Sequence, residues 1–367
     1  MDFNKFLQSD AVSEMNNRIS DREPGGMVDF GRAAELKIDR DTYLEAENRG
    51  LTLSELLETP EYDPSPGNSP LDAFERQLAL AGIRLGGKNP TLVDQFYQKA
   101  SSLMPEFILR EIKKGQSMRP ELSRLLANST VVNNNRYTPF HVDTSSTDKF
   151  SLRPIGEGSE IPQLIVTEQN HSINVAEYGL GLRASYKSLR YRTTAQFRVL
   201  LWYIGFKLQT DKIALVVDCL LNGDGNDNPA VTVNAASSGT MTYDDLITLW
   251  AEFEPFEMNT IICHINKLKS ILTLDEFKDP MAGYRFQGTG EMFSPLGASL
   301  VRCDEVPTDL VVGLDSRFAI EEVITQPLMV EYDKIIEQRF EEAVISESVA
   351  YAKVIREAAA VLDTIFA

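Results

Sequence analysis

One segment constrains the fold of this chain more than any other: a helical pattern that continues without a break over residues 193–221. Thr193-Thr194 is typical of a helix N-cap, and Asn222-Gly223 is typical of a helix end. At 1.5 Å per residue, a helix of about 28 residues spans on the order of 40 Å, which is too long for a compact small domain. Apolar residues surround much of its circumference, so we expect it to pack against several elements, including other subunits.

The residues just before this helix follow a strand period. Apolar side chains alternate with polar or glycine positions from Ile173 to Ala184, and a slip at Ala176-Glu177 indicates a bulge or a change of face. Residues 164–166 provide a partner strand and 167–171 a polar turn, so the sequence predicts a long β-hairpin. Because a two-stranded hairpin is marginal in water, something outside this stretch must cover it.

Beyond the helix, short helices and short strands follow one another without regular βαβ alternation or an internal repeat. The predicted helices are 243–253, capped by Thr242, 265–274 and 335–340. The predicted strands are 260–263, 298–301, 310–313 and 319–324. This pattern indicates an α+β fold.

The N-terminal part differs in composition. Residues 1–63 carry 15 acidic and 7 basic side chains, a net charge of −8, and the four prolines within 59–70 indicate a linker. Helical spacing returns over 71–81 and 92–109. A cationic stretch follows and is either a solvated helix face or an arm that docks on an acidic neighbour; its members are Arg110, Lys113, Lys114, Arg119 and Arg124.

Composition and charge exclude several classes of protein. An apolar share of 43% with 25% charged residues is ordinary globular composition, and the 54 acidic against 36 basic side chains give a net charge of −18. A free nucleic-acid binder needs the opposite balance. The sequence predicts neither a signal peptide nor a membrane span, hence a soluble intracellular protein. Cys219, Cys263 and Cys303 lie far apart, which predicts buried reduced thiols instead of disulfides or a zinc site.

The motif search yields little catalytic chemistry. The glycine pairs at 156–158 and 288–290 lack the third glycine of a dinucleotide fingerprint, so we interpret them as turns. In the acidic run 224–228, Pro229 stands where an EF-hand loop needs glycine, which favours a helix-terminating loop over a calcium site. Cys263 and His264 are neighbours on a predicted strand, so their side chains point to opposite faces and cannot act as nucleophile and base on each other.

The order of the elements is more informative than any single residue. A hairpin opened by the sequence Gly-Glu-Gly-Ser-Glu-Ile-Pro at 156–162 is followed by a strand entering 185–189 and by one very long helix ended at 222–226. Pro295-Leu296-Gly297-Ala298 and Val306-Pro307 then precede strands of a small α+β domain. From about residue 92 to the C-terminus, this order resembles the major capsid proteins of tailed bacteriophages, which have the Hong Kong ninety-seven-like fold.

The resemblance implies a division of the chain into five regions. These are an N-terminal extension (1–92), an extended N-arm (93–149), the E-loop hairpin (150–186), a peripheral domain with the spine helix (187–225 and 325–350), and an axial α+β domain (226–324 and 351–367). The extension is either a retained arm, which we favour, or an added domain. Since no lysine lies between 150 and 182, the E-loop is not expected to form the isopeptide cross-link known from some members.

The resemblance also implies a function. It predicts a structural protein, not an enzyme, that assembles into pentamers and hexamers of an icosahedral phage head in the host cytoplasm and then resides in the virion. Its partners would be copies of itself, a portal, scaffolding or decoration proteins, and double-stranded DNA bound without sequence specificity; no cofactor and no membrane are implied. The alternatives are an encapsulin-type nanocompartment shell with the same fold and a soluble intracellular enzyme with an unrecognised site.

Charge suggests how neighbouring subunits meet. Residues 150–182 hold one basic and four acidic side chains, a net charge of −3, whereas 183–212 hold seven basic and one acidic, a net charge of +6. We therefore predict that the acidic hairpin of one subunit lies near the basic segment of the next. The acidic candidates are Glu157, Glu160, Glu168 and Glu177, and the basic candidates are Arg190, Arg192 and Arg198.

Overall fold

The computed structural model describes residues 38–63, 71–142, 154, 157, 166–169, 171–278 and 295–366. The chain divides into two compact units, each assembled from three stretches of sequence. Unit 1 comprises Met1–Ser117, Gly179–Phe206 and Leu328–Ser346. Unit 2 comprises Met118–Tyr178, Lys207–Pro327 and Glu347–Ala367.

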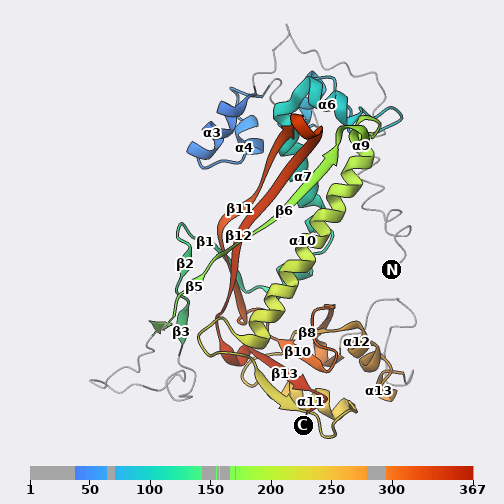
Figure 1. Cartoon of the computed structure of the whole chain (residues 1–367). Helices are drawn as coiled ribbons and strands as arrows, with labels where there is room; N and C mark the ends of the chain where they lie inside the picture. Colours follow the sequence, from blue (N-terminus) through green and yellow to red (C-terminus); the bar gives the residue numbers. More distant parts are fainter. Residues whose placement is uncertain are drawn as a thin grey trace. The chain divides into compact units, whose positions relative to one another are not determined.

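The long helix predicted from the sequence is present as α10 (Thr194–Asn222), a single helix of 29 residues (Figure 1). At its start, Thr193 Oγ1 accepts a hydrogen bond from the Gln196 N–H, and Gln196 Oε1 accepts one from the Thr193 N–H, both at 3.3 Å. The helix ends at Gly223, whose φ of +79° suits glycine. The resemblance placed the whole helix in one domain, whereas it contributes residues to both units.

Helices build most of unit 1. They are α3 (Arg40–Asn48), α4 (Leu53–Leu57), α5 (Ala73–Leu80), α6 (Val93–Ala100), α7 (Met104–Ser117), α9 (Tyr186–Arg190) and the first part of α10, with the short 3₁₀ helix η1 (Ser101–Leu103). Phe96 and Phe107 are at most 1% exposed, and their ring centroids lie 5.2 Å apart. The helices predicted over 71–81 and 92–109 are therefore confirmed, the second with a break at η1, and α6 and α7 stand where the resemblance implied an extended arm.

The described part of the N-terminal extension is folded onto these helices. Tyr43 OH donates to the Ser102 carbonyl at 2.6 Å, and Arg76 Nε lies 2.7 Å from Asp63 Oδ1 in a buried ion pair. Arg110 pairs with Asp72. The described residues 38–63 and 71–80 thus contribute packed helices, where a retained arm was favoured from the sequence.

A five-stranded mixed sheet forms the centre of unit 2. Its order is β7 (Val231–Asn234), β13 (Ala359–Asp363), β10 (Leu310–Leu314), β8 (Thr260–Cys263) and β9 (Ser299–Arg302). The outer pairs β7/β13 and β8/β9 are parallel, and the two pairs that involve β10 are antiparallel. The strands predicted at 260–263, 298–301 and 310–313 are confirmed, within a residue or two at their ends.

Helices cover both faces of this sheet. Val312, Leu314 and Ile262 share one apolar cluster with α10 residues such as Val216 and Leu220, and with α8 (Glu121–Leu125). The opposite face packs against α11 (Tyr243–Ala251) and α12 (Ile265–Leu272), which α13 (Asp275–Lys278) follows. As predicted, Thr242 caps α11, in a capping box with Asp245. The α+β class is therefore confirmed.

A second sheet has the order β1 (Asn128–Val131), β11 (Ile320–Ile335), β12 (Phe340–Lys353) and β6 (Ala176–Ser185) (Figure 1). The helix predicted over 335–340 is wrong: the 3₁₀ turn η5 (Ile336–Gln338) joins β11 to β12 there. One turn of helical spacing cannot nucleate a helix between two long strands. Arg339, with φ +57°, completes the reversal.

Candidate assembly surfaces

The hairpin predicted for the E-loop is present with different partners. Strand β2 (Arg136–Tyr137) pairs with β5 (Ile173–Asn174), and β3 (Phe140–Val142) pairs with β4 (Val166–Glu168), both antiparallel. The legs of the hairpin are thus 136–142 and 166–174, so it starts before residue 150. The pairing of 164–166 with 173–184 is wrong, because β6 instead lies beside β12, which offers a far longer partner than three residues. Residues 167 and 168 of the predicted polar turn belong to one leg of the hairpin.

The acidic candidates of the hairpin lie at the surface where they are described. Glu157, Glu168 and Glu177 are exposed, and Glu160 lies outside the described residues. All three belong to unit 2, whereas the basic candidates belong to unit 1. Whether they meet between subunits stays a prediction.

The basic candidates differ from one another. Arg192 is exposed, and Arg190 ends α9, with a side chain outside the described part of the structure. Arg198 does not have the exposed position that the hypothesis assumed: its side chain is 5% exposed, and its Nε lies 3.1 Å from Glu111 Oε2. Arg192 is therefore the accessible candidate.

Arg198 belongs to a buried polar cluster between α7 and α10. Glu111 also accepts a hydrogen bond from Trp202 Nε1 at 2.6 Å and pairs with Lys114 at 2.9 Å. Burial pushes the pKa of Glu111 upward, but Arg198, Lys114 and the hydrogen bonds outweigh it, so the pKa lies below its ordinary value. The cluster fixes α10 to α7 and leaves Arg198 no free guanidinium for another subunit.

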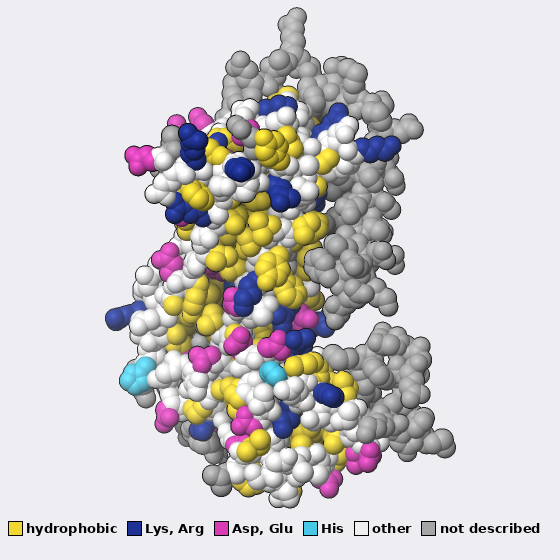
Figure 2. Space-filling view, turned by 45° about the vertical axis from the view of Figure 1, so that its right-hand side comes forward, with side chains coloured by type: hydrophobic (Ala, Val, Ile, Leu, Met, Phe, Trp, Pro, Cys, Tyr) yellow, Lys and Arg dark blue, Asp and Glu magenta, His cyan; other side chains and the backbone are white. Residues whose placement is uncertain are grey.

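The helix α10 displays large apolar side chains at the surface of unit 1. Val199, Leu200, Tyr203 and Phe206 are 41%, 43%, 64% and 42% exposed. Tyr203 lies three or four residues from each of the other three, which places the group on one side of the helix. Figure 2 shows hydrophobic side chains gathered on one face of the molecule. Such a group is larger than the single exposed apolar residues that are normal for a monomer.

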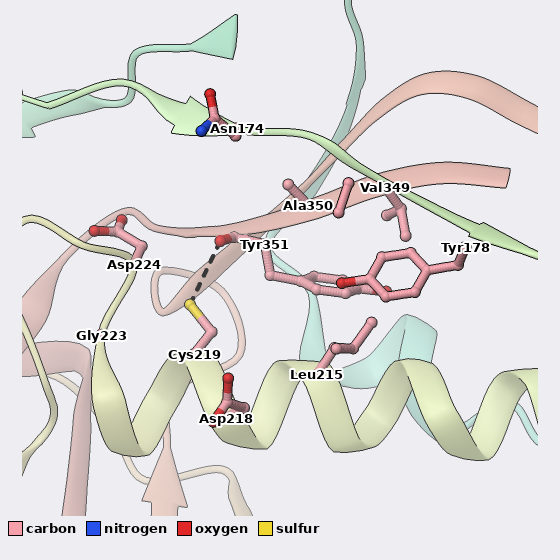
Figure 3. A pocket seen from close by; sticks show the side chains of 11 residues that line it. Asn174, Tyr178, Leu215, Asp218, Cys219, Gly223, Asp224, Val349, Ala350 and Tyr351 are labelled. Atoms are coloured by element: carbon pink, nitrogen blue, oxygen red, sulfur yellow. Dashed lines mark hydrogen bonds between the residues drawn. The ribbon is translucent and has the colours of Figure 1, made fainter. Parts of the chain in front are cut away.

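A hollow of about 200 Å³ lies beside the C-terminal end of α10 in unit 2 (Figure 3). Its walls come from α10, the loop after it, β12 and the segment 174–178. Cys219 donates its thiol hydrogen to the Tyr351 carbonyl, with sulfur and oxygen 3.5 Å apart. Burial, with a contribution from Asp224, raises the pKa of Cys219 to about 12. A thiol that stays protonated is not a nucleophile, so this hollow does not support cysteine catalysis.

The remaining sequence motifs have structural roles. Asp224 accepts hydrogen bonds from the N–H groups of Asn226 and Lys353 at 3.2 and 3.0 Å, so the run after α10 is the predicted helix-terminating loop. His264 Nδ1 accepts from the Asn266 N–H and caps α12. All three cysteines are buried and free, as predicted. The glycine motifs at 156–158 and 288–290 lie outside the described residues.

The described residues were also considered as possible metal-binding and membrane-spanning elements. They contain no group of three or more histidine, cysteine, aspartate or glutamate side chains placed to hold a metal ion. No helix within the same ranges combines the length and the apolar character needed to cross a membrane.

Comparison with known proteins found similarity in structure only. No protein-family model and no curated protein matches the chain. The similar structures include an encapsulin, a virus-like particle and a phage capsid. The SrpI encapsulin complex of Synechococcus elongatus is 16% identical with a TM-score of 0.47, over 67% of this chain and 88% of that one.

Two further structures are similar to the same extent. The virus-like particle of Pyrococcus furiosus is 12% identical with a TM-score of 0.48, over 71% of this chain and 97% of that one. The capsid of the cyanophage P-SCSP1u is 13% identical with a TM-score of 0.46, over 66% and 87%. An encapsulin and a phage capsid, the two kinds of shell considered from the sequence, are thus both among the similar structures.

Proposed function

We propose that this chain is the major subunit of a closed protein shell, a phage capsid that encloses double-stranded DNA. One observation carries the proposal: α10 keeps a row of large apolar side chains at the surface of its own chain. Leu200 and Tyr203 are 43% and 64% exposed within the first ten residues of a 29-residue helix. Copies of the chain that cover this row would remove apolar area from water, worth about 25 cal/mol per Å².

The hairpin supports the same proposal. Within the described residues its legs pair over two and three residues, and Phe140 is 63% exposed. An arm with so little core of its own gains stability by lying on a neighbouring subunit. Many small contacts of this kind add up to the large interfaces of permanent assemblies.

The acidic character of the chain suits a DNA container. A chain with a net charge of −18 binds phosphate groups weakly, so a shell built from it would not bind packaged DNA tightly. The role is structural and needs no active site; portal, scaffolding and decoration proteins are the further partners, and the virion is the location. The same shell enclosing an enzyme would be an encapsulin, and the contents of purified particles separate the two.

Placing a charge in the α10 row is expected to prevent assembly. In Tyr203→Asp, the carboxylate would have to be buried between subunits without a partner, so particles should be lost while the subunit stays folded. Electron microscopy and size-exclusion chromatography with light scattering measure the particles, and circular dichroism measures folding. Gln95→Asp is the control, because it adds the same charge at an exposed position of α6. Normal particles from Tyr203→Asp, or a wild-type chain that stays a small monomer or dimer under all conditions, would contradict the proposal.

Reversing the hairpin charges is expected to weaken assembly modestly. Glu157→Lys with Glu168→Lys would place like charges near Arg192, and exposed pairs are worth about 0.2 to 1 kcal/mol each. The concentration of subunit needed for assembly should rise at low salt and approach the wild-type value at high salt. Adding Arg192→Glu should restore part of the loss. An unchanged salt dependence would exclude these residues from the contact.

A further inference from the structure

Two neighbouring glutamates of β11 hold the base of the hairpin. Glu321 and Glu322 follow each other on a strand, so their side chains point to opposite faces of the sheet. Beside them runs β1, parallel to β11, with Asn128 opposite Glu321 and Ser129 opposite Glu322. The chain continues from β1 through a short turn into the first leg of the hairpin.

Glu321 accepts hydrogen bonds from both sides of that turn. Before the turn, Thr130 Oγ1 donates to Glu321 Oε1 at 2.5 Å; after it, Tyr137 OH donates to Oε2 at 2.8 Å. Burial, together with this hydrogen bond, raises the pKa of Tyr137 to about 12, so the hydroxyl keeps its proton. Thr325 also donates to the carbonyl of Asn134 within the turn, at 3.3 Å. One carboxylate therefore closes the turn from which the hairpin departs.

Glu322 connects the same strand to the interior of unit 2. Its Oε2 accepts a hydrogen bond from Ser129 Oγ at 3.0 Å, and its Oε1 accepts one from Tyr351 OH at 3.3 Å. Lys212 Nζ lies 3.6 Å from Glu322 and also pairs with Glu347. Glu322 and Glu347 are 7% and 8% exposed. Strand β1 is thereby joined to buried residues of β12 and to α10.

We propose that Glu321 and Glu322 are positioning residues that set the direction in which the hairpin leaves the body of the subunit. The proposal rests on the proposed function, in which the hairpin reaches a neighbouring copy. The direction of a hairpin that has no core of its own depends on the contacts at its base. Strand β1 pairs with β11 over four residues, and this pairing alone would let the hairpin rotate about its base. Hydrogen bonds to a carboxylate are stronger than those between neutral groups, so they restrict this rotation. In this proposal, the charged side chain at 321 promotes assembly by orienting the hairpin of its own subunit.

Hydrogen exchange of the unassembled chain tests the positioning role. In Glu321→Ala, the amides of Tyr137 and Ile173 are expected to exchange at least 10-fold faster, while those of the five-stranded sheet keep their wild-type rates. Tyr137→Phe should act in the same direction with a smaller effect. Glu331→Ala, which removes an exposed glutamate from the same strand, is the control and should change nothing. Wild-type exchange in the hairpin of Glu321→Ala, or equal acceleration throughout unit 2, would overturn the proposal.

Assembly of the same variant separates this proposal from the proposed function. Glu321→Ala is expected to form at least 10-fold fewer closed particles than Glu331→Ala at the same subunit concentration. Normal particles from a chain whose hairpin exchanges faster would overturn the positioning role and leave the shell function intact. A wild-type chain that never assembles would refute the shell function, whatever the exchange rates show.

Discussion

Replacing Gly205 by alanine is expected to lower the free energy of unfolding of unit 1 by at least about 2 kcal/mol. Gly205 of α10 lies against α7 so closely that a Cβ there would overlap the Ile112 carbonyl oxygen and lie 2.9 Å from the Gln116 nitrogen. Both obstacles are backbone atoms, so no side-chain rotation relieves them. Alanine favours a helix over glycine by about 1 kcal/mol, which offsets only part of this cost.

The opposite helix offers a reciprocal test. A Cβ on Gly115 of α7 would overlap the Trp202 carbonyl oxygen, so Gly115→Ala should destabilise in the same way. Because either substitution forces the two helices apart, the double variant should cost less than the sum of the single variants. Separation of the helices would also lengthen the 2.6 Å hydrogen bond from Trp202 to Glu111. The fluorescence emission of Trp202 should therefore shift, and it can be observed alone in a Trp250→Phe background, because the chain has two tryptophans.

Urea unfolding followed by circular dichroism measures the change in stability. Gly181→Ala is the control, because a Cβ at that position would meet only Glu342 Oε1, at 4.0 Å. It should leave stability within about 0.5 kcal/mol of wild type, as for most surface substitutions. A stability of Gly205→Ala within the same range would show that the helices can separate without loss.

Local sequence patterns were sufficient for much of the fold. The 193–221 pattern gave α10 within a residue at each end, and Thr242 and Gly223 act at the helix ends where capping rules place them. These signals lie within a few residues of the structure that they specify. The three strands at 260–263, 298–301 and 310–313 are buried and short, so their composition identifies them without knowledge of their partners.

The wrong predictions concern strand pairing and burial that depend on residues far away in the sequence. The hairpin was predicted to pair with its nearest neighbour in sequence, but β6 lies beside β12, more than 150 residues away. Arg198 was expected at a subunit contact because it lies in the basic segment 183–212, yet it is buried and paired with Glu111, 87 residues earlier. A signal for this burial was present: Arg198 stands between Phe197 and Val199 in an apolar run, four residues before Trp202. Glycine within the same run at 205 was a further sign of a close helix contact.

The contacts at the base of the hairpin could not be predicted from the local sequence either. A Glu-Glu pair on a strand is ordinary in sequence, and nothing near residue 321 indicates that Thr130 and Tyr137 donate hydrogen bonds to it. Charge counting therefore located the exposed residues of the hairpin and missed those that orient it. Surfaces made by one segment can be predicted from that segment, whereas positioning by residues nearly 200 apart requires the fold.

Replacing Lys353 by methionine is expected to stabilise the unassembled chain at neutral pH. The Lys353 side chain is 1% exposed, and its Nζ has no hydrogen-bond partner among the described residues. Burial lowers the pKa of Lys353 to about 8; Arg356 acts in the same direction, and Cys219 and Asp224 act in the opposite one. Keeping the ammonium protonated inside the folded chain therefore costs free energy that methionine, of similar length, does not require.

The expected pH dependence has a definite sign. In the unfolded chain, Lys353 holds its proton up to about pH 10.5, whereas in the folded chain it loses the proton near pH 8. Between these values the unfolded state binds more protons, so the stability of the wild-type chain rises with pH in this window. Below pH 8 the cost is complete, and at 1.36 kcal/mol per pKa unit it amounts to about 3 kcal/mol. The advantage of Lys353→Met should thus be largest at pH 7 and shrink steadily toward pH 10.

Urea unfolding of both chains at intervals from pH 6 to pH 10, under conditions that keep the subunit unassembled, measures this difference. Tyrosine ionisation and cysteine ionisation in the unfolded state affect both chains alike and cancel when the two stabilities are subtracted. Cys219, which interacts with Lys353, has a pKa of about 12 in the folded chain and stays protonated over this range. Lys269→Met, at an exposed position of α12, is the control and should differ from wild type by a small amount that does not change with pH. A gain for Lys353→Met that is equally independent of pH would mean that Lys353 is already neutral at pH 7 or keeps an ordinary pKa in the folded chain. A loss of stability at pH 7 would mean instead that the ammonium has a partner worth more than its burial costs.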